Sequence, residues 1–174
     1  TNIVDRADDQ LAALMYTGGT TGRAKGVMLS HENLYFAGKS AQEASHAPGL
    51  IRTIVPLPLA HSFGLIVTVV GLHHPEAHVS ILQRWFDAAD WIKLVEEHKV
   101  QQSTVVPTML QILLGMPLED HDLSSLEDIV SGASPLPLEV AEEFERRVPS
   151  VKIREGYGLS ETSASCCVTP VGGR

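Results

Sequence analysis

Near its start the chain reads Tyr16-Thr17-Gly18-Gly19-Thr20-Thr21-Gly22-Arg23-Ala24-Lys25-Gly26, a stretch rich in glycine, threonine and cations. Glycine lets the backbone bend through positive φ and bring its N–H groups close to an anion. The threonine hydroxyls add hydrogen-bond donors, and the lysine adds a positive point charge. We interpret the stretch as a phosphate-binding loop, although a plain turn between two strands has a similar composition.

The spacing within this loop excludes a Walker A motif. That motif requires Gly-Lys-Ser/Thr at a fixed distance from an earlier glycine, whereas Lys25 stands between Ala24 and Gly26. Two apolar runs flank the loop, Leu11 to Tyr16 and Gly26 to Leu29. We predict that they pair as a hairpin around it.

The composition is that of one globular domain. The chain has 174 residues, 44% hydrophobic and 20% charged, which is enough to bury a sizeable core. The formal charge of −8 disfavours non-specific binding of nucleic acid, which needs a basic face. The longest apolar run, Phe63 to Leu72, is too short to cross a bilayer, so we expect no transmembrane segment.

The cysteines, Cys166 and Cys167, are adjacent in the sequence. Their Cα atoms are about 3.8 Å apart across a trans peptide, below the usual range for a disulfide. We therefore expect free thiols in a reducing compartment, which favours a cytoplasmic location.

Short β-rich runs alternate with segments of helical period along the rest of the chain. Strands are predicted at 51–57, 79–82, 103–106, 129–130 and 151–153. Helices are predicted at about 31–44 after the cap Ser30, at 63–72, after the cap Asp87, at 108–114 and at 138–147. The run 63–72 is apolar all round, which favours a buried helix, and a strand is the alternative there. This alternation predicts an α/β fold, a mainly parallel sheet with flanking helices, whose ligands bind beyond the carboxyl ends of the strands.

Two loops after predicted strands carry residues suited to a ligand. The first, Pro58 to Gly64, holds His61, which can close over a ligand or move a proton; a histidine that merely begins a helix is the alternative. The second runs from Ser131 to Leu136 and contains Gly132, Ala133 and Ser134. Small residues there let a flat ring lie against the backbone, although an ordinary strand-to-helix turn looks the same.

A further loop, Gly156 to Thr162, places Tyr157 between two glycines, so that its ring has room to stack on a base. Ser160 offers a hydroxyl, and Glu161 offers a hard oxygen ligand suited to Mg²⁺. A tight turn with a surface glutamate is the alternative. Together with the glycine loop, these segments supply phosphate donors, a ring platform and a metal ligand, a set that suits a magnesium nucleotide.

These motifs resemble those of the acyl-adenylate-forming superfamily, the AMP-binding enzymes, which include acyl-CoA synthetases, firefly luciferase and peptide-synthetase adenylation domains. Residues 16–26 look like its phosphate-loop signature, and Gly156 to Thr162 resembles its Tyr-Gly-x-Ser/Thr-Glu signature. Two further segments of the superfamily, in the same order along the chain, are similar to Leu57 to Gly64 and Gly132 to Leu136. Leu159 is typical of the fatty-acyl or aryl-CoA ligases within the superfamily, because peptide synthetases usually have proline there.

The resemblance implies a role for each candidate residue. Contacts with the ATP phosphates would come from Thr17, Thr20, Thr21 and Lys25, in a loop made mobile by Gly18, Gly19 and Gly22. The adenine would stack on Tyr157, beside Gly158 and against the backbone of Gly132, Ala133 and Ser134. Ser160 would touch the α-phosphate and Glu161 would hold Mg²⁺, while His61 would lie near the carboxylate of the acid. Lys25, Glu161 and His61 are thus the expected catalytic residues.

The implied reaction joins a small-molecule carboxylic acid, fatty or related, to ATP, giving acyl-AMP and pyrophosphate, and then transfers the acyl group to coenzyme A. The pocket for the acid is expected to involve side chains such as His61, Phe63, Val105 and Thr108. The sequence departs from the family pattern at Gly18, where serine is usual, and at Ala24 and Ala60, where proline and an aromatic residue are usual.

Family members are several times longer than this chain. We therefore expect residues 1–174 to be an internal fragment of the large N-terminal domain, without the N-terminal part, the ribose-binding segment and the C-terminal lysine domain. Such a fragment is expected to be inactive alone. A non-catalytic nucleotide- or acyl-binding module is the alternative function.

Two remaining stretches favour structural roles. Pro75 argues against a helix that would place two histidines of the stretch His73 to His78 on one face, so we expect a solvated loop and not a metal site. The hydrophobic core is expected to include Trp85, Phe86 and Trp91.

Overall fold

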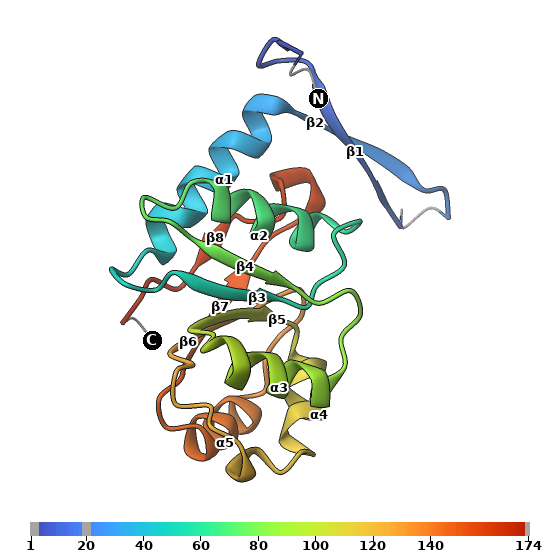
Figure 1. Cartoon of the computed structure of the whole chain (residues 1–174). Coiled ribbons are helices and arrows are strands. Elements are labelled where there is room, and N and C mark those ends of the chain that lie inside the picture. The colour runs from blue at the N-terminus through green and yellow to red at the C-terminus, as the bar shows by residue number, and fades with distance from the viewer. Residues whose placement is uncertain (1–3, 19–21, 173–174) are drawn as a thin grey trace.

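The chain builds two sheets that share no strand (Figure 1). The structure is a computed structural model that describes residues 4–18 and 22–172. The smaller sheet consists of β1 (Leu11–Thr17) and β2 (Lys25–Ser30), which pair antiparallel. This confirms the predicted hairpin, which projects away from the larger sheet at the top of Figure 1.

The larger sheet has the strand order β4-β3-β5-β6-β7-β8. Its strands are β3 (Arg52–Val55), β4 (Val79–Leu82), β5 (Gln102–Val105), β6 (Asp128–Ser131), β7 (Lys152–Tyr157) and β8 (Cys167–Val168). The first five are parallel, and β8 pairs antiparallel with β7. The predicted mainly parallel α/β fold is therefore confirmed, and β8, which has two residues, is the strand that the sequence did not predict.

The helices form two layers, one on each side of the larger sheet (Figure 1). One layer contains α1 (His31–Ser45) and α2 (Ser62–Leu72), which pack against each other. The other contains α3 (Ala88–His98), α4 (Pro107–Leu114) and α5 (Leu138–Arg147). Two short 3₁₀ helices, η1 (Leu118–Asp120) and η2 (Ser160–Thr162), complete the described elements. None of the described helices is long and apolar enough to cross a membrane.

Local capping explains why the helix starts were predictable. Ser30 Oγ accepts a hydrogen bond from the Asn33 N–H (3.1 Å), and Asn33 Oδ1 accepts one from the Ser30 N–H (3.0 Å). Asp87 Oδ1 accepts from the Asp90 N–H at 2.8 Å at the start of α3. Each bond satisfies a backbone donor that has no partner within its own helix.

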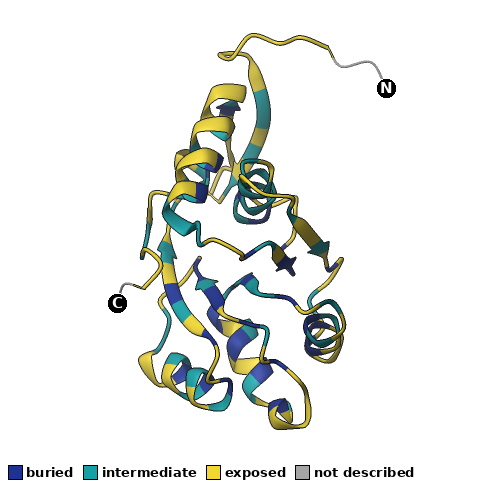
Figure 2. Cartoon of the chain, turned by 60° about the vertical axis from the view of Figure 1, so that its left-hand side comes forward, coloured by how far each residue is buried: buried dark blue, intermediate teal, exposed yellow. Residues whose placement is uncertain are grey.

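The hydrophobic core lies between the larger sheet and the layer of α3, α4 and α5, where buried residues concentrate (Figure 2). Trp91 is fully buried there, and Phe86 packs against the same cluster. The prediction for Trp85 was wrong, because its side chain is 73% exposed. Trp85 lies in the connection between β4 and α3 and turns outward, where the guanidinium of Arg84 lies 5.8 Å from its ring centre.

The stretch His73 to His78 connects α2 to β4 without forming a helix, as predicted. It is less solvated than expected. His74 Nε2 lies 3.0 Å from the Leu50 carbonyl oxygen, and its ring stacks on that of His78 with 4.9 Å between centroids. Burial, and next the nearby His74, lower the pKa of His78, whose Nε2 lies 2.9 Å from Thr53 Oγ1.

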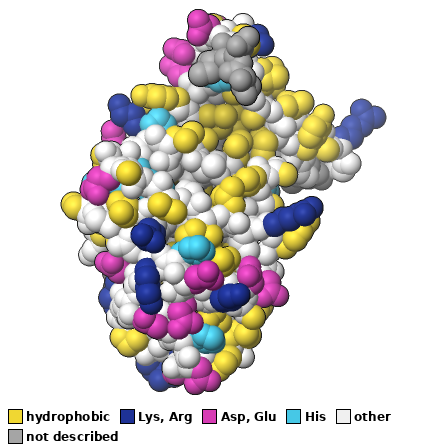
Figure 3. All heavy atoms as spheres, viewed as in Figure 1, with side chains coloured by type: hydrophobic (Ala, Val, Ile, Leu, Met, Phe, Trp, Pro, Cys, Tyr) yellow, Lys and Arg dark blue, Asp and Glu magenta, His cyan; other side chains and the backbone are white. Residues whose placement is uncertain are grey.

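The surface shown in Figure 3 divides into two regions. Acidic and basic side chains are interspersed over the lower layer, and hydrophobic side chains gather toward the top. Exposed apolar residues of the hairpin and α1 include Leu14, Tyr16, Met28, Tyr35 and Phe36. No single-sign basic patch dominates this face of the described chain.

A buried ion pair joins β6 to β7. Arg154 donates from Nε to Asp128 Oδ1 and from Nη2 to Asp128 Oδ2, both at 2.6 Å. Its Nη1 donates to the Thr169 carbonyl oxygen, also at 2.6 Å. Only 2% of the Arg154 side chain and 7% of the Asp128 side chain are exposed. The guanidinium therefore depends on these partners in place of water.

We predict that Asp128→Ala lowers the free energy of unfolding by about 3–5 kcal/mol, because it leaves the Arg154 guanidinium buried without its carboxylate. Urea denaturation followed by circular dichroism measures the loss. The matched control is Glu143→Ala, which removes the exposed Glu143–Arg146 pair of α5 and should cost less than about 1 kcal/mol. Equal losses for the two variants would contradict the prediction.

Candidate nucleotide and acid site

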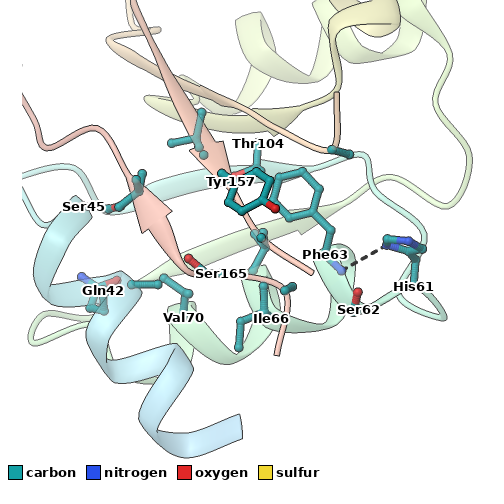
Figure 4. A pocket seen from close by; sticks show the side chains of 18 of the residues that line it. Gln42, Ser45, His61, Ser62, Phe63, Ile66, Val70, Thr104, Tyr157 and Ser165 are labelled. Carbon is teal, nitrogen blue, oxygen red and sulfur yellow. Dashed lines mark hydrogen bonds between the residues drawn. The ribbon is translucent and has the colours of Figure 1, made fainter. Parts of the chain in front are cut away.

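A cavity of about 450 Å³ lies between the larger sheet and the layer of α1 and α2. It opens toward the loops that follow β3, β6 and β7, at the carboxyl ends of these parallel strands (Figure 4). This is the position in which open parallel sheets bind ligands. The cavity is within the size range of small-molecule sites.

The cavity brings together predicted residues from four segments that are far apart in the sequence. Those that line it are Thr17, Gly18, His61, Ala133, Tyr157, Gly158, Ser160 and Glu161. The remaining described candidates, Gly22, Lys25, Gly132 and Ser134, do not line it. Gly19, Thr20 and Thr21 lie outside the described residues.

The glycine loop reaches this cavity from the smaller sheet and not from the larger one. Thr17 and Gly18 at the end of β1 line the cavity, and β2 contacts η2, which contains Glu161. Lys25 pairs with Thr17 in the register of the hairpin and is exposed. The hairpin thus brings the start of the glycine loop to the cavity that Glu161 also lines.

His61 begins a helix and also lines the cavity. It is the N-cap of α2, and its Nδ1 accepts a hydrogen bond from the Phe63 N–H at 3.2 Å. Because Nδ1 accepts, the neutral ring carries its proton on Nε2, which is then a donor. His61 is exposed and lines the cavity (Figure 4), so this donor is available to a ligand.

The Tyr157 loop is held by close backbone contacts. A Cβ on Gly158 would lie 1.5 Å from the Ala164 carbonyl oxygen, so only glycine fits there. The Leu159 N–H donates to Thr162 Oγ1 at 3.0 Å, and Ser160 Oγ lies 3.0 Å from Ser62 Oγ at the start of α2. The loop is therefore tied to the helix that His61 begins.

Gly132 does not line the cavity, and the side on which a Cβ would stand is closely packed. A Cβ on it would meet the Phe63 ring at 2.9 Å and the Gly156 carbonyl oxygen at 3.1 Å. Ala133 next to it has φ of 70° and does line the cavity. The small residues of this loop thus allow Phe63 to approach the sheet, and Ala133 presents the surface that a ring can use.

A magnesium ion fits this donor set as a partner of phosphate. The described residues contain no group of three His, Cys, Asp or Glu side chains that could hold a metal ion. Mg²⁺ is typically held by one or two carboxylates together with substrate phosphates and water. The single carboxylate of Glu161, on the cavity that the start of the glycine loop also lines, matches that pattern.

The cavity also has lining residues that the sequence did not predict. They lie on α1, on α2 and on the sheet face between them, and include Gln42, Ser45, Ile66, Val70, Gln102, Thr104, Asp128 and Arg154. Val105 and Thr108, which were expected near the acid, do not line this cavity: Val105 belongs to the core, and Thr104 lines the cavity in its place. The sequence signal that could have indicated some of these lining residues is the presence of charged residues inside β-rich runs, such as Asp128 and Arg154.

The comparisons with known proteins agree with this fold and site. The family model described as "AMP-binding enzyme" matches residues 2–174, and the chain belongs to that family. It is 41% identical over 160 residues to the 4-coumarate--CoA ligase-like 2 of Arabidopsis thaliana and 36% identical over 159 residues to the long-chain-fatty-acid--CoA ligase of Bacillus subtilis. These matches cover 90% of this chain and 28% of each relative.

Solved structures give the same result. The o-succinylbenzoate coenzyme A synthetase (MenE) of Bacillus subtilis, in complex with ATP and magnesium ion, superimposes with a TM-score of 0.81 at 29% sequence identity. The match covers 94% of this chain and 33% of that one. The fold expected from the resemblance is therefore confirmed.

We predict that Gly158→Ala destabilises the protein by at least about 1–3 kcal/mol, the usual cost of overpacking, because the Ala164 backbone must move. The control is Gly156→Ala on the other side of Tyr157, where a Cβ would meet Val130 Cγ1 at an ordinary 3.4 Å. Thermal and urea unfolding of the two variants make the test. A Gly158→Ala protein as stable as Gly156→Ala would refute the close approach.

Proposed function

We propose that this chain is the nucleotide- and acid-binding part of an enzyme that activates a carboxylic acid with ATP and passes the acyl group to coenzyme A. The observation that carries the proposal is the shared cavity. The start of the glycine loop, at Thr17 and Gly18, lines the same cavity as Tyr157, Ser160 and Glu161. The proposal draws support from relatives named as acid--CoA ligases and from a similar structure bound to ATP and magnesium ion.

In this proposal the nucleotide lies across the carboxyl ends of the strands. The adenine stacks on Tyr157, whose side chain is 63% exposed, with Ala133 and Gly158 beside it. The α-phosphate lies near Ser160, and the outer phosphates meet the glycine loop with its threonines and Lys25. Glu161 holds Mg²⁺, which supplies charge neutralisation on the phosphates when it is bound.

The proposed chemistry is an attack of the acid's carboxylate oxygen on the α-phosphorus, with pyrophosphate as the leaving group. Negative charge grows on the phosphate oxygens, so fixed donors and cations aimed at them lower the barrier. The Nε2–H of His61 donates to a carboxylate oxygen of the acid and orients the other for attack. The acyl-AMP then reacts with the thiol of coenzyme A, which releases AMP.

We further propose that the isolated chain binds the nucleotide without completing turnover, because it spans under a third of the length of these relatives. A cytoplasmic location belongs to the same proposal, and the free, exposed Cys166 and Cys167 support it. Steady pyrophosphate release from the chain with ATP and an acid would overturn the first statement. A protein that contains this chain and has the full length of the relatives gives the second test. If it binds the nucleotide but releases no pyrophosphate with any acid, a non-catalytic module is favoured.

We predict that Glu161→Gln weakens the binding of Mg-ATP about tenfold to ~100-fold, because a charge-assisted interaction contributes about 1.5–3 kcal/mol. Isothermal titration calorimetry with and without Mg²⁺ measures the effect, and the loss should appear only with the metal. The control is Glu139→Gln, which makes the same change in the first turn of α5, in the opposite helix layer. If Glu139→Gln weakens binding as much as Glu161→Gln does, the assignment of Glu161 fails.

A further inference from the structure

The sheet face that α1 and α2 cover is polar, unlike the face that packs the core. Side chains alternate between the two faces of a strand. Ile54, Val105 and Ile129 belong to the core, while their neighbours Thr53, Thr104 and Asp128 line the cavity. Buried sheet faces are normally apolar. A polar face inside the fold therefore indicates a surface that meets a polar group.

A chain of hydrogen bonds crosses this face near the first residues of the strands. Thr53 Oγ1 donates to Gln102 Oε1 at 3.4 Å, and Gln102 Nε2 donates to Asp128 Oδ2 at 3.2 Å. Because Thr53 donates its own proton to Gln102, it accepts from His78 Nε2 at 2.9 Å. Arg154 completes the row through its two bonds to Asp128. The row is fixed in orientation and lines the cavity.

Gln42, on α1, lines the same cavity as this row. It is only 8% exposed and lines the cavity, yet its side-chain amide forms no hydrogen bond with any other residue in the described part of the chain. Its amide atoms are not among the described buried side-chain atoms that lack a hydrogen-bond partner, so they are open to the cavity and can bond water or a ligand there. Ser45, one helical turn further on, also lines the cavity. The pair offers an amide and a hydroxyl to a ligand.

Gln42 lies at the opposite end of the cavity from His61 (Figure 4). α2 runs between the two ends and lines the middle with Ile66, Val67 and Val70. Four-residue strands such as β3 and β5 have a length of about 10–13 Å at ~3.3 Å per residue. The cavity therefore has a histidine at one end, apolar side chains in the middle and, at the other end, an amide that bonds no other described residue.

We propose that the acid bound here carries a hydroxyl or similar hydrogen-bonding group at the end remote from its carboxylate, and that Gln42 recognises this group. The inference rests on the proposed function, in which His61 holds the carboxylate. A plain alkyl chain of the same length would exclude water from the Gln42 amide without replacing its hydrogen bonds. Sites built to bond a substrate hydroxyl discriminate strongly against the analogue that lacks it.

The test is direct binding of paired acids to the chain by calorimetry or by chemical-shift titration. The pairs are 8-hydroxyoctanoate with octanoate and 10-hydroxydecanoate with decanoate. We expect the chain to bind at least one hydroxy acid about tenfold or more tightly than its partner. Gln42→Leu should abolish this preference while retaining binding of the unsubstituted acid, and Ser45→Ala should reduce the preference less. Gln111→Leu, on the exposed side of α4, is the matched control and should keep it.

Equal or tighter binding of the unsubstituted acids overturns the inference, as does the failure of every acid to bind. An unchanged preference in folded Gln42→Leu and Ser45→Ala also overturns it. Mg-ATP binding measured on the same samples distinguishes a failure of this inference from a failure of the proposed function. If Mg-ATP binds through Glu161 and the acids are not discriminated, only the inference fails; if Mg-ATP does not bind, the proposed function fails.

Discussion

The buried contact between Arg154 and Asp128 is the interaction on which the site depends. The Arg154 guanidinium donates hydrogen bonds to the Asp128 carboxylate on β6. It also donates one to the Thr169 carbonyl oxygen in the segment after β8. It lies on β7, three residues before Tyr157, so it fixes the strand from which the Tyr157 loop begins. A buried ion pair contributes little net stability compared with apolar packing. Its position is better explained by the polar wall that it gives the cavity.

The two faces of the larger sheet have different roles in the fold. The face toward α3, α4 and α5 is apolar and supplies the hydrophobic core. The face toward α1 and α2 is polar and lines the cavity. The parallel strands then bring the His61, Ala133 and Tyr157 loops to one edge. The glycine loop is added from a separate hairpin, so its approach to the cavity depends on the contact between β2 and η2.

Most elements were predictable because local signals mark their ends. β4 (Val79–Leu82) and α5 (Leu138–Arg147) have the predicted bounds, and Ser30 and Asp87 cap their helices as expected. The polar row was not predictable, because it depends on the register between strands, such as Thr53 beside Gln102. Val105 and Thr104 show the same limit of sequence-based prediction. Neighbouring residues of a strand point to opposite faces, so an error of one residue exchanges a core side chain for one that lines the cavity. Two-residue β8 depends on a pairing with β7 that no local pattern encodes.

His61 caps a helix and also lines the cavity. The sequence offered a helix cap and a ligand-facing histidine as alternatives. In the structure the cap uses Nδ1 as the acceptor of the Phe63 N–H, and this bond selects the tautomer with the proton on Nε2. The neutral tautomer that this cap selects has a hydrogen-bond donor at the other ring nitrogen, on a residue that lines the cavity. A lysine at this position would supply charge but could not accept the backbone N–H, so the helix start itself favours histidine over a simpler cation.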